Sequence, residues 1–234
     1  MDRIFFPLDD IEESIEVKGN EFKHLGFSRR ARVGDTVEIL NGQGSIFTGS
    51  ISEFTSNSCR IEIDAKLSQT HKSPSVSIAF PIIDKNNFEF VLKSSIPFEI
   101  KEFFPVITKR TDAGKKKAER FNQERLFEIS VSALKQSGNP WLPRITEPIY
   151  LSQIKMKNFD LVLTSHITGK KITMIKTKII NSENILLIVG PEGDFTETEL
   201  DYLRKSGTEL INLNAYTLRS EVALMTILSQ VRAF

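Results

Sequence analysis

Alternating hydrophobic and polar positions mark much of the first third of the chain as strands. Thr36–Leu40, Ser45–Ile51 and Cys59–Ala65 are short strand-like runs, and in the last of them apolar residues recur at every second position. Asn41 and Gly42 follow the first run, and this dipeptide favours a two-residue type I′ hairpin turn, because both central residues of that turn need positive φ. No helical pattern follows the turn, so a nucleotide-binding loop is not expected here. The pattern predicts a small antiparallel barrel or sheet.

Beyond a polar break at Thr70–Ser75, strand-like and helix-like patterns alternate. The break contains a proline, and we place the domain boundary there, between residues 1–70 and 71–234. Such alternation is typical of an α/β domain whose parallel sheet is buried on both faces. The predicted strands are Val76–Ile83, Phe103–Ile107, Phe159–Thr164 and Ile185–Val189, and the predicted helices are Phe88–Ile96 and Lys115–Ser137, the latter with Phe127, Val131 and Leu134 on one face.

Composition limits the classes of protein that the chain can belong to. Hydrophobic residues make up 40% and charged residues 26%, which is typical of a globular protein. No apolar run approaches the roughly 20 residues of a membrane helix, and the first residues lack the order of a signal peptide. The single cysteine, Cys59, cannot form a disulfide within the chain, and no Cys or His spacing fits a metal site. We therefore expect a cytoplasmic protein without a membrane segment or a bound metal.

Charge is nearly balanced, but its distribution is uneven. The net charge is +1, and basic residues gather at Arg29, Arg30 and Arg32 and again along the stretch from Lys109 to Arg125. A single run of this kind is usually a solvated helix face. Two separate clusters in a near-neutral chain favour a polyanionic partner such as a nucleic acid.

The first segment that carries candidate chemistry is Val189–Leu200. It follows a buried strand directly and opens a helix, for which Thr196 and Glu199 have the spacing of a capping box. Gly190 and Gly193 allow the backbone to approach a ligand closely, with amide groups directed at it. Ligands bind at such strand-to-helix crevices in open α/β sheets. We interpret the segment as a ligand site; a tight turn without a ligand is the alternative.

The second segment, Ile211–Ala223, again has the order strand, loop, helix. In the last helix, Leu224, Ile227, Leu228 and Val231 recur at helical spacing and form an apolar face. Arg219 and Glu221 lie in its first turn. Either residue alone would be interpreted as a surface arginine or as a glutamate favoured by the helix dipole.

Together the two segments resemble the trefoil-knotted (SPOUT) methyltransferases. The residues that carry this resemblance are Gly-Pro-Glu-Gly-Asp-Phe-Thr-x-x-Glu from Gly190 and Leu-x-x-x-x-Leu-Arg-x-Glu-x-Ala from Leu213. Over nearly its whole length the chain is similar to the bacterial 16S ribosomal RNA uracil-N3 methyltransferase family. His24–Asp35 is similar to that family's small RNA-binding barrel of PUA type, and Thr108–Thr111 and Gln136–Ser137 match two further stretches. At Asn214, Tyr216, Thr217 and Val222 the family usually has Gly, Arg, Ile and Thr, and it has Arg at Asn139.

The resemblance implies a C-terminal knotted α/β methyltransferase domain behind a small N-terminal PUA-like β-barrel. It implies that S-adenosyl-L-methionine binds in a bent form among the last loops. The cofactor-binding residues expected from it are Thr164, Val189, Gly190, Pro191, Gly193, Leu213, Asn214 and Leu218. The RNA-binding residues expected are Arg29, Arg30, Arg32, Lys109, Arg110 and Gln136.

Methylation of uracil N3 requires that nitrogen to lose its proton, so the site needs a general base or a cation that stabilises the uracil anion. Arg219 is the predicted stabilising cation or phosphate anchor. Glu221 and Glu192 are candidates for the base or for holding Arg219. The expected partners are 16S ribosomal RNA in the small ribosomal subunit and a second copy of the chain, since the apolar face of the last helix needs a partner surface.

Two alternatives stay open at this point. One is a knotted enzyme that methylates a ribose 2′-hydroxyl of transfer or ribosomal RNA. The other is a non-catalytic RNA-binding protein of ribosome assembly.

Overall fold

The structure is a computed structural model that describes residues 1–8, 13–111 and 122–234, without the side chains of residues 27–29. Contacts divide the chain into two compact units. The first comprises Met1–His71 with Val131–Leu142, and the second Lys72–Ser130 with Pro143–Phe234. The sequence-based domain limits had assigned Val131–Leu142 to the second domain, whereas the structure groups it with the first unit.

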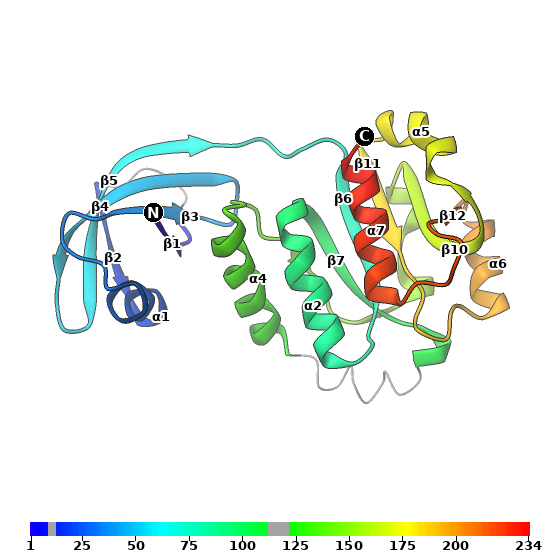
Figure 1. The fold of residues 1–234 in the computed structure, drawn as a ribbon, viewed down its shortest axis with the longest axis horizontal. Coiled ribbons are helices and arrows are strands. Elements are labelled where there is room, and N and C mark those ends of the chain that lie inside the picture. The colour runs from blue at the N-terminus through cyan, green and yellow to red at the C-terminus, as the bar shows by residue number, and fades with distance from the viewer. Residues whose placement is uncertain (9–12, 112–121) are drawn as a thin grey trace. The chain divides into compact units, whose positions relative to one another are not determined.

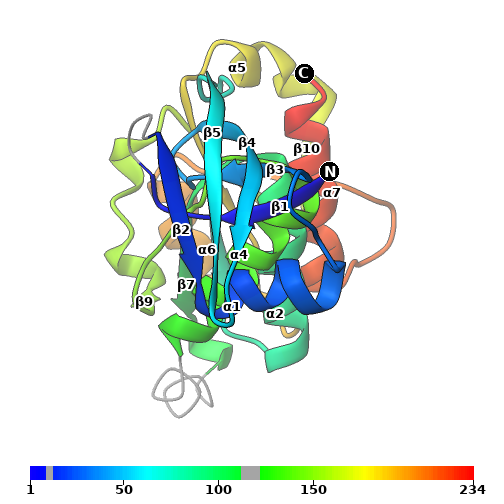
Figure 2. The ribbon, with the colours of Figure 1, turned by 90° about the vertical axis from the view of Figure 1, so that its left-hand side faces the viewer.

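The first unit is a curled five-stranded sheet (Figures 1 and 2). The β1–β3 pair is parallel and the other pairs are antiparallel. Its inner face buries an apolar cluster that includes Ile4, Val37, Phe47 and Ile61. In sheet order the strands are β1 (Asp2–Phe5), β3 (Thr36–Leu40), β4 (Ser45–Phe54), β5 (Ser58–Ser68) and β2 (Ser14–Lys18), and α1 (Gly19–Lys23) follows β2.

The connection between β3 and β4 differs from the predicted two-residue hairpin. It comprises four residues, and positive φ angles occur at Gly42 and Gly44 but not at Asn41. The Asn41 side chain accepts hydrogen bonds from the backbone N–H groups of Gln43 (2.8 Å) and Ser45 (2.9 Å), which fixes the wider turn. A Cβ atom at Gly44 would lie 2.1 Å from the ring of Trp141, so this glycine allows a distant segment of the chain to pack on the turn.

The second unit is built on a parallel sheet, as predicted. The strand order is β12–β10–β11–β6–β7, and both β8 and β9 pair with β7. The strands are β6 (Ser75–Pro81), β7 (Ile100–Ile107), β8 (Arg144–Ile145), β9 (Ile149–Tyr150), β10 (Leu161–Lys171), β11 (Asn184–Ile188) and β12 (Glu209–Asn212). All four predicted strands of this domain are confirmed, although the boundaries shift by a few residues.

Helices cover both faces of this sheet. Leu200 of α6 packs with Leu186 and Ile188 of β11, so alternate residues such as Leu187 face the opposite side. On that opposite side α2 and α7 pack against each other (Figure 1). The helices of the second unit are α2 (Lys85–Ser95), α5 (Lys176–Ile180), α6 (Glu197–Lys205) and α7 (Ser220–Arg232), and α4 (Gln123–Ser137) is divided between the two units.

Two predictions about helices need correction. The apolar face of α7 is fully buried within its own unit, so the argument that this face requires a second copy of the chain is wrong. In α4, Val131 and Leu134 are buried, but Phe127 is half exposed. The predicted first part of that helix, residues 115–121, lies outside the described residues. No helix among the described residues is long and apolar enough to cross a membrane.

Candidate functional site

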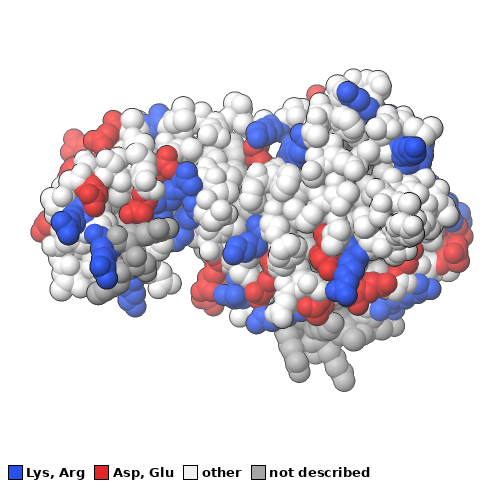
Figure 3. All heavy atoms as spheres, viewed as in Figure 1, with Lys and Arg blue, Asp and Glu red and all other residues white. Residues whose placement is uncertain are grey.

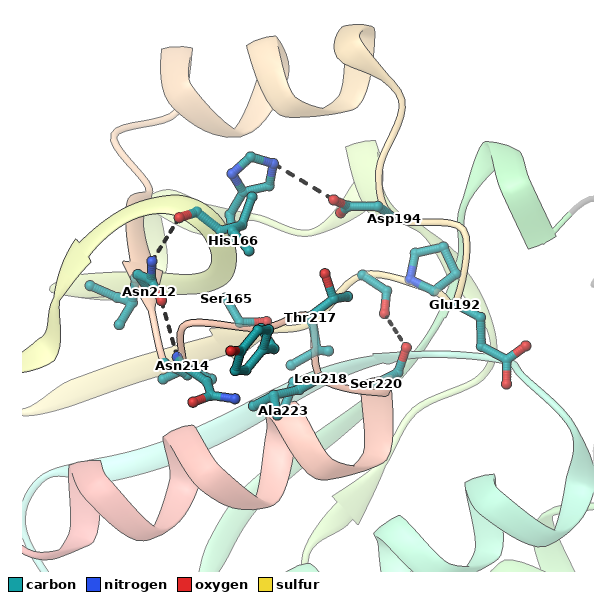
Figure 4. Close-up of a pocket in the computed structure, with 17 residues that line it drawn as sticks. Ser165, His166, Glu192, Asp194, Asn212, Asn214, Thr217, Leu218, Ser220 and Ala223 are labelled. Carbon is teal, nitrogen blue, oxygen red and sulfur yellow. Dashed lines mark hydrogen bonds and ion pairs between the residues drawn. The ribbon is translucent and has the colours of Figure 1, made fainter.

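A pocket lies beyond the carboxyl ends of the central strands of the second unit (Figure 4). Its walls come from Ser165–Ile167 of β10, from the loop that follows β11, and from the segment between β12 and α7. In a parallel sheet these strand ends meet at one edge, which is where open α/β sheets bind ligands. The two segments singled out in the sequence therefore share one pocket.

The loop after β11 is held in a fixed shape by its own hydrogen bonds. The N–H of Asp194 donates to the carbonyl of Pro191 (2.8 Å), and Asp194 adopts φ +62°, which is uncommon for a residue other than glycine. Thr196 and Glu199 form the predicted capping box at the start of α6. The Ser220 hydroxyl donates to the carbonyl of Gly190 (2.7 Å) and so joins this loop to the first turn of α7.

The segment between β12 and α7 is anchored at its start as well. The N–H of Asn214 donates to Oδ1 of Asn212 (3.0 Å), and Nδ2 of Asn212 donates to the carbonyl of Ile167 (2.7 Å; Figure 4). These bonds fix the loop against β10. Both loops that line the pocket are therefore held by hydrogen bonds to neighbouring elements.

His166 and Asp194 face each other across one wall of the pocket (Figure 4). The N–H of Thr168 donates to Nδ1 of His166 (3.3 Å), so this nitrogen is the acceptor of the ring. A neutral imidazole then carries its proton on Nε2, which lies 3.6 Å from Oδ2 of Asp194. The pair links β10 to the loop after β11.

Six of the eight predicted cofactor residues line this pocket, and two do not. Thr164 is fully buried behind it, with a hydroxyl that has no hydrogen-bond partner among the described residues. Gly193 does not line the pocket, because a Cβ atom at this position would face Cδ of Arg110 at 3.3 Å. The six lining residues are Val189, Gly190, Pro191, Leu213, Asn214 and Leu218.

The three predicted catalytic residues do not meet in the pocket. Glu192 lines it, but its carboxylate points away from the other labelled side chains (Figure 4). Arg219 is exposed and directly precedes α7. Glu221 is only 8% exposed and borders a separate groove beside Phe90, where its Oε2 has no partner within the described part of the chain.

The predicted RNA contacts in the second unit are hydrogen-bonded to the loop after β11 and to the first turn of α6. Nη1 of Arg110 donates to the carbonyl of Gly193, and Nζ of Lys109 donates to Oγ1 of Thr198 (2.8 Å). Both side chains keep exposed surface.

In the first unit Arg30, Arg32 and Gln136 are exposed, and the side chain of Arg29 lies outside the described residues. On the face drawn in Figure 3, Lys and Arg side chains are mixed with Asp and Glu rather than gathered in one patch.

Among the lining residues, His166 lies outside both segments singled out in the sequence, whereas Asn212, Tyr216 and Ser220 lie in the second segment without having been named as ligand residues. His166 stands two residues after the predicted strand end at Thr164, a position from which the rule for open α/β sheets would have found it. Cys59 offers no nucleophile, because its thiol is buried and burial raises its pKa to about 11. Among the residues described, no group of three or more His, Cys, Asp or Glu could hold a metal ion.

Comparison with known proteins supports the fold class. The profile of the RNA methyltransferase domain matches residues 71–232, and that of the RNA methyltransferase PUA domain matches residues 17–64. A ribosomal RNA small subunit methyltransferase E of Neisseria gonorrhoeae, solved with S-adenosyl methionine, superposes with a TM-score of 0.85 at 22% identity, covering 100% of this chain and 97% of that one.

Two curated relatives carry the same name, ribosomal RNA small subunit methyltransferase E. That of Aquifex aeolicus is 28% identical and covers 99% of each chain, and that of Rickettsia conorii is 28% identical over 87% of this chain and 82% of its own length.

A parallel sheet with a pocket at its carboxyl edge, in a chain that also matches the RNA methyltransferase PUA domain, defines an α/β methyltransferase with a PUA-like domain. The chain belongs to the RNA methyltransferase family.

Proposed function

We propose that the chain transfers a methyl group from S-adenosylmethionine to N3 of a uridine in 16S ribosomal RNA. The observation that carries this proposal is the pocket between the loop after β11 and the loop before α7, in a chain matched by the RNA methyltransferase domain over residues 71–232. The two relatives named above act, by their names, on the RNA of the small subunit. A protein that acts on ribosomal RNA works beside ribosomes, which supports a cytoplasmic location for this one.

The composition of the pocket fits S-adenosylmethionine. Among the described residues that line it, Glu192 and Asp194 carry carboxylates and none is Lys or Arg. A pocket of this charge favours a cationic ligand, and both the sulfonium and the amino group of the cofactor are cationic. Ile211, Leu213, Leu218 and Ala223 add apolar surface, and the backbone of Gly190 adds polar groups.

Within this proposal each side chain has a defined task. The cofactor supplies an electrophilic methyl group when bound, and the protein brings uracil N3 into line with it. Arg219 is assigned to the developing negative charge on the uracil ring or to a flanking phosphate, because its guanidinium is exposed beside the pocket loop. Glu192 lines the pocket and Glu221 does not, which favours Glu192 as the group that receives the N3 proton, but its carboxylate points away from the other labelled side chains and has to turn toward the base (Figure 4).

Calorimetry with S-adenosylmethionine tests the proposal. The unsubstituted protein is expected to bind it, and Gly190→Val to weaken binding by about 100-fold or more, since a side chain there would push Phe195 and Asp194, both about 3.2 Å from an added Cβ. Gly26→Ala is the matched control, because its added methyl group would meet a single ring carbon at 4.0 Å. Absence of binding by the unsubstituted protein would contradict the proposal.

We further propose that the protein is a homodimer whose interface includes the outer side of α2 and α7. Phe90 is 52% exposed and Val222 is 45% exposed, and both border a groove that also contains Met225. Side-chain oxygens of Glu221 and Gln230 are buried along this groove without partners among the described residues. Docking of a second copy would cover the apolar side chains and offer hydrogen-bond donors to these oxygens.

Light scattering at micromolar concentration is expected to give twice the chain mass of 26.6 kDa. Met225→Lys should place a charge in the groove and shift the mass to that of the single chain. Met174→Lys, at a methionine that is 73% exposed outside the groove, is the control and should stay dimeric. A mass near 26.6 kDa for the unsubstituted protein would rule out the dimer.

A further inference from the structure

Tyr216 leaves its aromatic ring open to solvent at the edge of the pocket. Its side chain is 81% exposed, whereas Phe90, the next most exposed aromatic residue of the described part, is 52% exposed. Tyr216 nevertheless lines the pocket together with Asn214 and Thr217. A ring exposed to this degree contributes little to the stability of the free protein, so its stacking energy is available to a ligand.

The loop that carries Tyr216 is fixed on both sides of this residue. On the N-terminal side the N–H of Asn214 donates a hydrogen bond to Oδ1 of Asn212 (3.0 Å), and Nδ2 of Asn212 donates to the carbonyl of Ile167 (2.7 Å). On the C-terminal side the hydroxyl of Ser220 donates a hydrogen bond to the carbonyl of Gly190 (2.7 Å). An exposed ring on an anchored backbone loses less conformational entropy on binding than one on a free loop. The position is therefore preorganised to receive a flat partner.

A nucleobase is the flat partner that the neighbouring chemistry suits. The edge of a paired base is inaccessible, so a base that reacts in the pocket must leave its stack, and extruded bases are commonly stacked on aromatic side chains. The exposed guanidinium of Arg219 lies three residues away and can meet the attached phosphate or the base itself. We propose that Tyr216 is the stacking platform that holds the target base of the RNA at the pocket. This inference rests on the proposed function, and it adds a positioning residue for the substrate.

Two other occupants would explain the same exposed ring. The adenine of the cofactor also has a π face, and a second copy of the chain would also cover an exposed aromatic residue. Loss of the ring would lower cofactor affinity if the ring stacks on the adenine, and it would lower the mass in solution if a second copy covers the ring. If the ring is a platform for the target base, its loss would lower the affinity for RNA.

The experiment compares Tyr216→Phe, Tyr216→Leu and Tyr216→Ala. Small ribosomal subunits from a strain that lacks this protein serve as substrate and as binding probe. We expect Leu and Ala to raise both the KM and the dissociation constant for subunits by about 5- to 150-fold, the range measured for removal of one aromatic–base stack. Tyr216→Phe keeps the ring, so its KM and its dissociation constant for subunits should stay within about twofold of those of the unsubstituted protein. Leu separates stacking from bulk, because it is apolar and nearly as large but has no π face.

Three results would overturn the inference. The first is unchanged subunit affinity in the Tyr216→Ala variant. The second is a loss of subunit affinity in Tyr216→Phe as large as that in Tyr216→Ala, which would assign the role to the hydroxyl. The third is a change in the Ala variant of another equilibrium that accounts for its loss of subunit affinity. That change would be an equally large fall in cofactor affinity by calorimetry, or a fall of the mass to that of the single chain by light scattering. Subunit affinity needs no turnover, so it decides the role of Tyr216 even if the unsubstituted protein were to transfer no methyl group, the result that would contradict the proposed function instead.

Discussion

Replacing Arg219 with alanine is expected to lower methyl transfer by about 100- to 1,000-fold, the usual effect of removing one group that stabilises developing charge. Cofactor affinity should stay within about twofold, because Arg219 does not line the pocket. Arg219→Lys should recover little activity, since a point charge cannot replace a planar guanidinium that binds two oxygen atoms at once. Steady-state kinetics with labelled cofactor and small ribosomal subunits measure the effect.

Arg204→Ala is the matched control for this prediction. Arg204 is another exposed arginine of the same unit, and it pairs with Asp201 at 3.1 Å within α6. Turnover should be unchanged in this control. Near-normal turnover in Arg219→Lys would show that charge alone suffices, and near-normal turnover in Arg219→Ala would remove Arg219 from the mechanism.

The second large effect is expected on stability, from Arg232→Met. The guanidinium of Arg232 donates to the carbonyls of Pro74 (2.6 Å), Phe98 (2.9 Å) and Glu99 (2.7 Å), and so ties the end of α7 to the segments that precede β6 and β7. Burial lowers the pKa of Arg232, but the guanidinium remains charged at neutral pH. Methionine keeps the apolar stem and removes all three hydrogen bonds.

We expect this variant to lose about 3 kcal/mol or more of unfolding free energy, since each bond involves a charged donor and the carbonyls lose their partner. For a chain of this size that loss lowers Tm by roughly 6–12 °C. Arg144→Met is the control, because the side chain of Arg144 is 76% exposed and its ion pair with Glu102 should contribute less than about 1 kcal/mol. Equal melting temperatures for the two variants would contradict the stabilising role of the three Arg232 hydrogen bonds.

The periodic segments of the chain were predictable from the sequence. Apolar runs such as Ile185–Val189 identify strands buried on both faces, and their alternation with helices predicts the parallel sheet that the structure contains. A knotted topology was predicted from the resemblance alone, because physical rules on chain connections make knots too rare to propose. Capping at Thr196 was also predictable, since the two partners of a capping box are three residues apart.

Features that depend on contacts between distant residues could not be predicted in this way. The turn at Asn41 is widened by the side chain of that residue, and Trp141, 97 positions after Gly44, packs on it. Arg232 looks in the sequence like an ordinary cation at a helix C-terminus, and only the folded chain brings three carbonyls to it.

The candidate site was predictable as two segments and not as a set of side chains. Sequence cannot tell which way the missing side chain of a glycine would point. Gly193 was therefore expected to face the ligand, whereas it faces Arg110. Glu221 stood near Arg219 in the sequence, yet the helix directs it to a separate groove beside Phe90.

The most direct test of the proposed function is methyl transfer from labelled S-adenosylmethionine to small ribosomal subunits of a strain that lacks this protein, followed by mass spectrometry of the RNA nucleosides. We predict that the label appears in N3-methyluridine of 16S ribosomal RNA and that transfer is lost in the Gly190→Val variant. Label on a ribose, or on transfer RNA alone, would contradict the assignment.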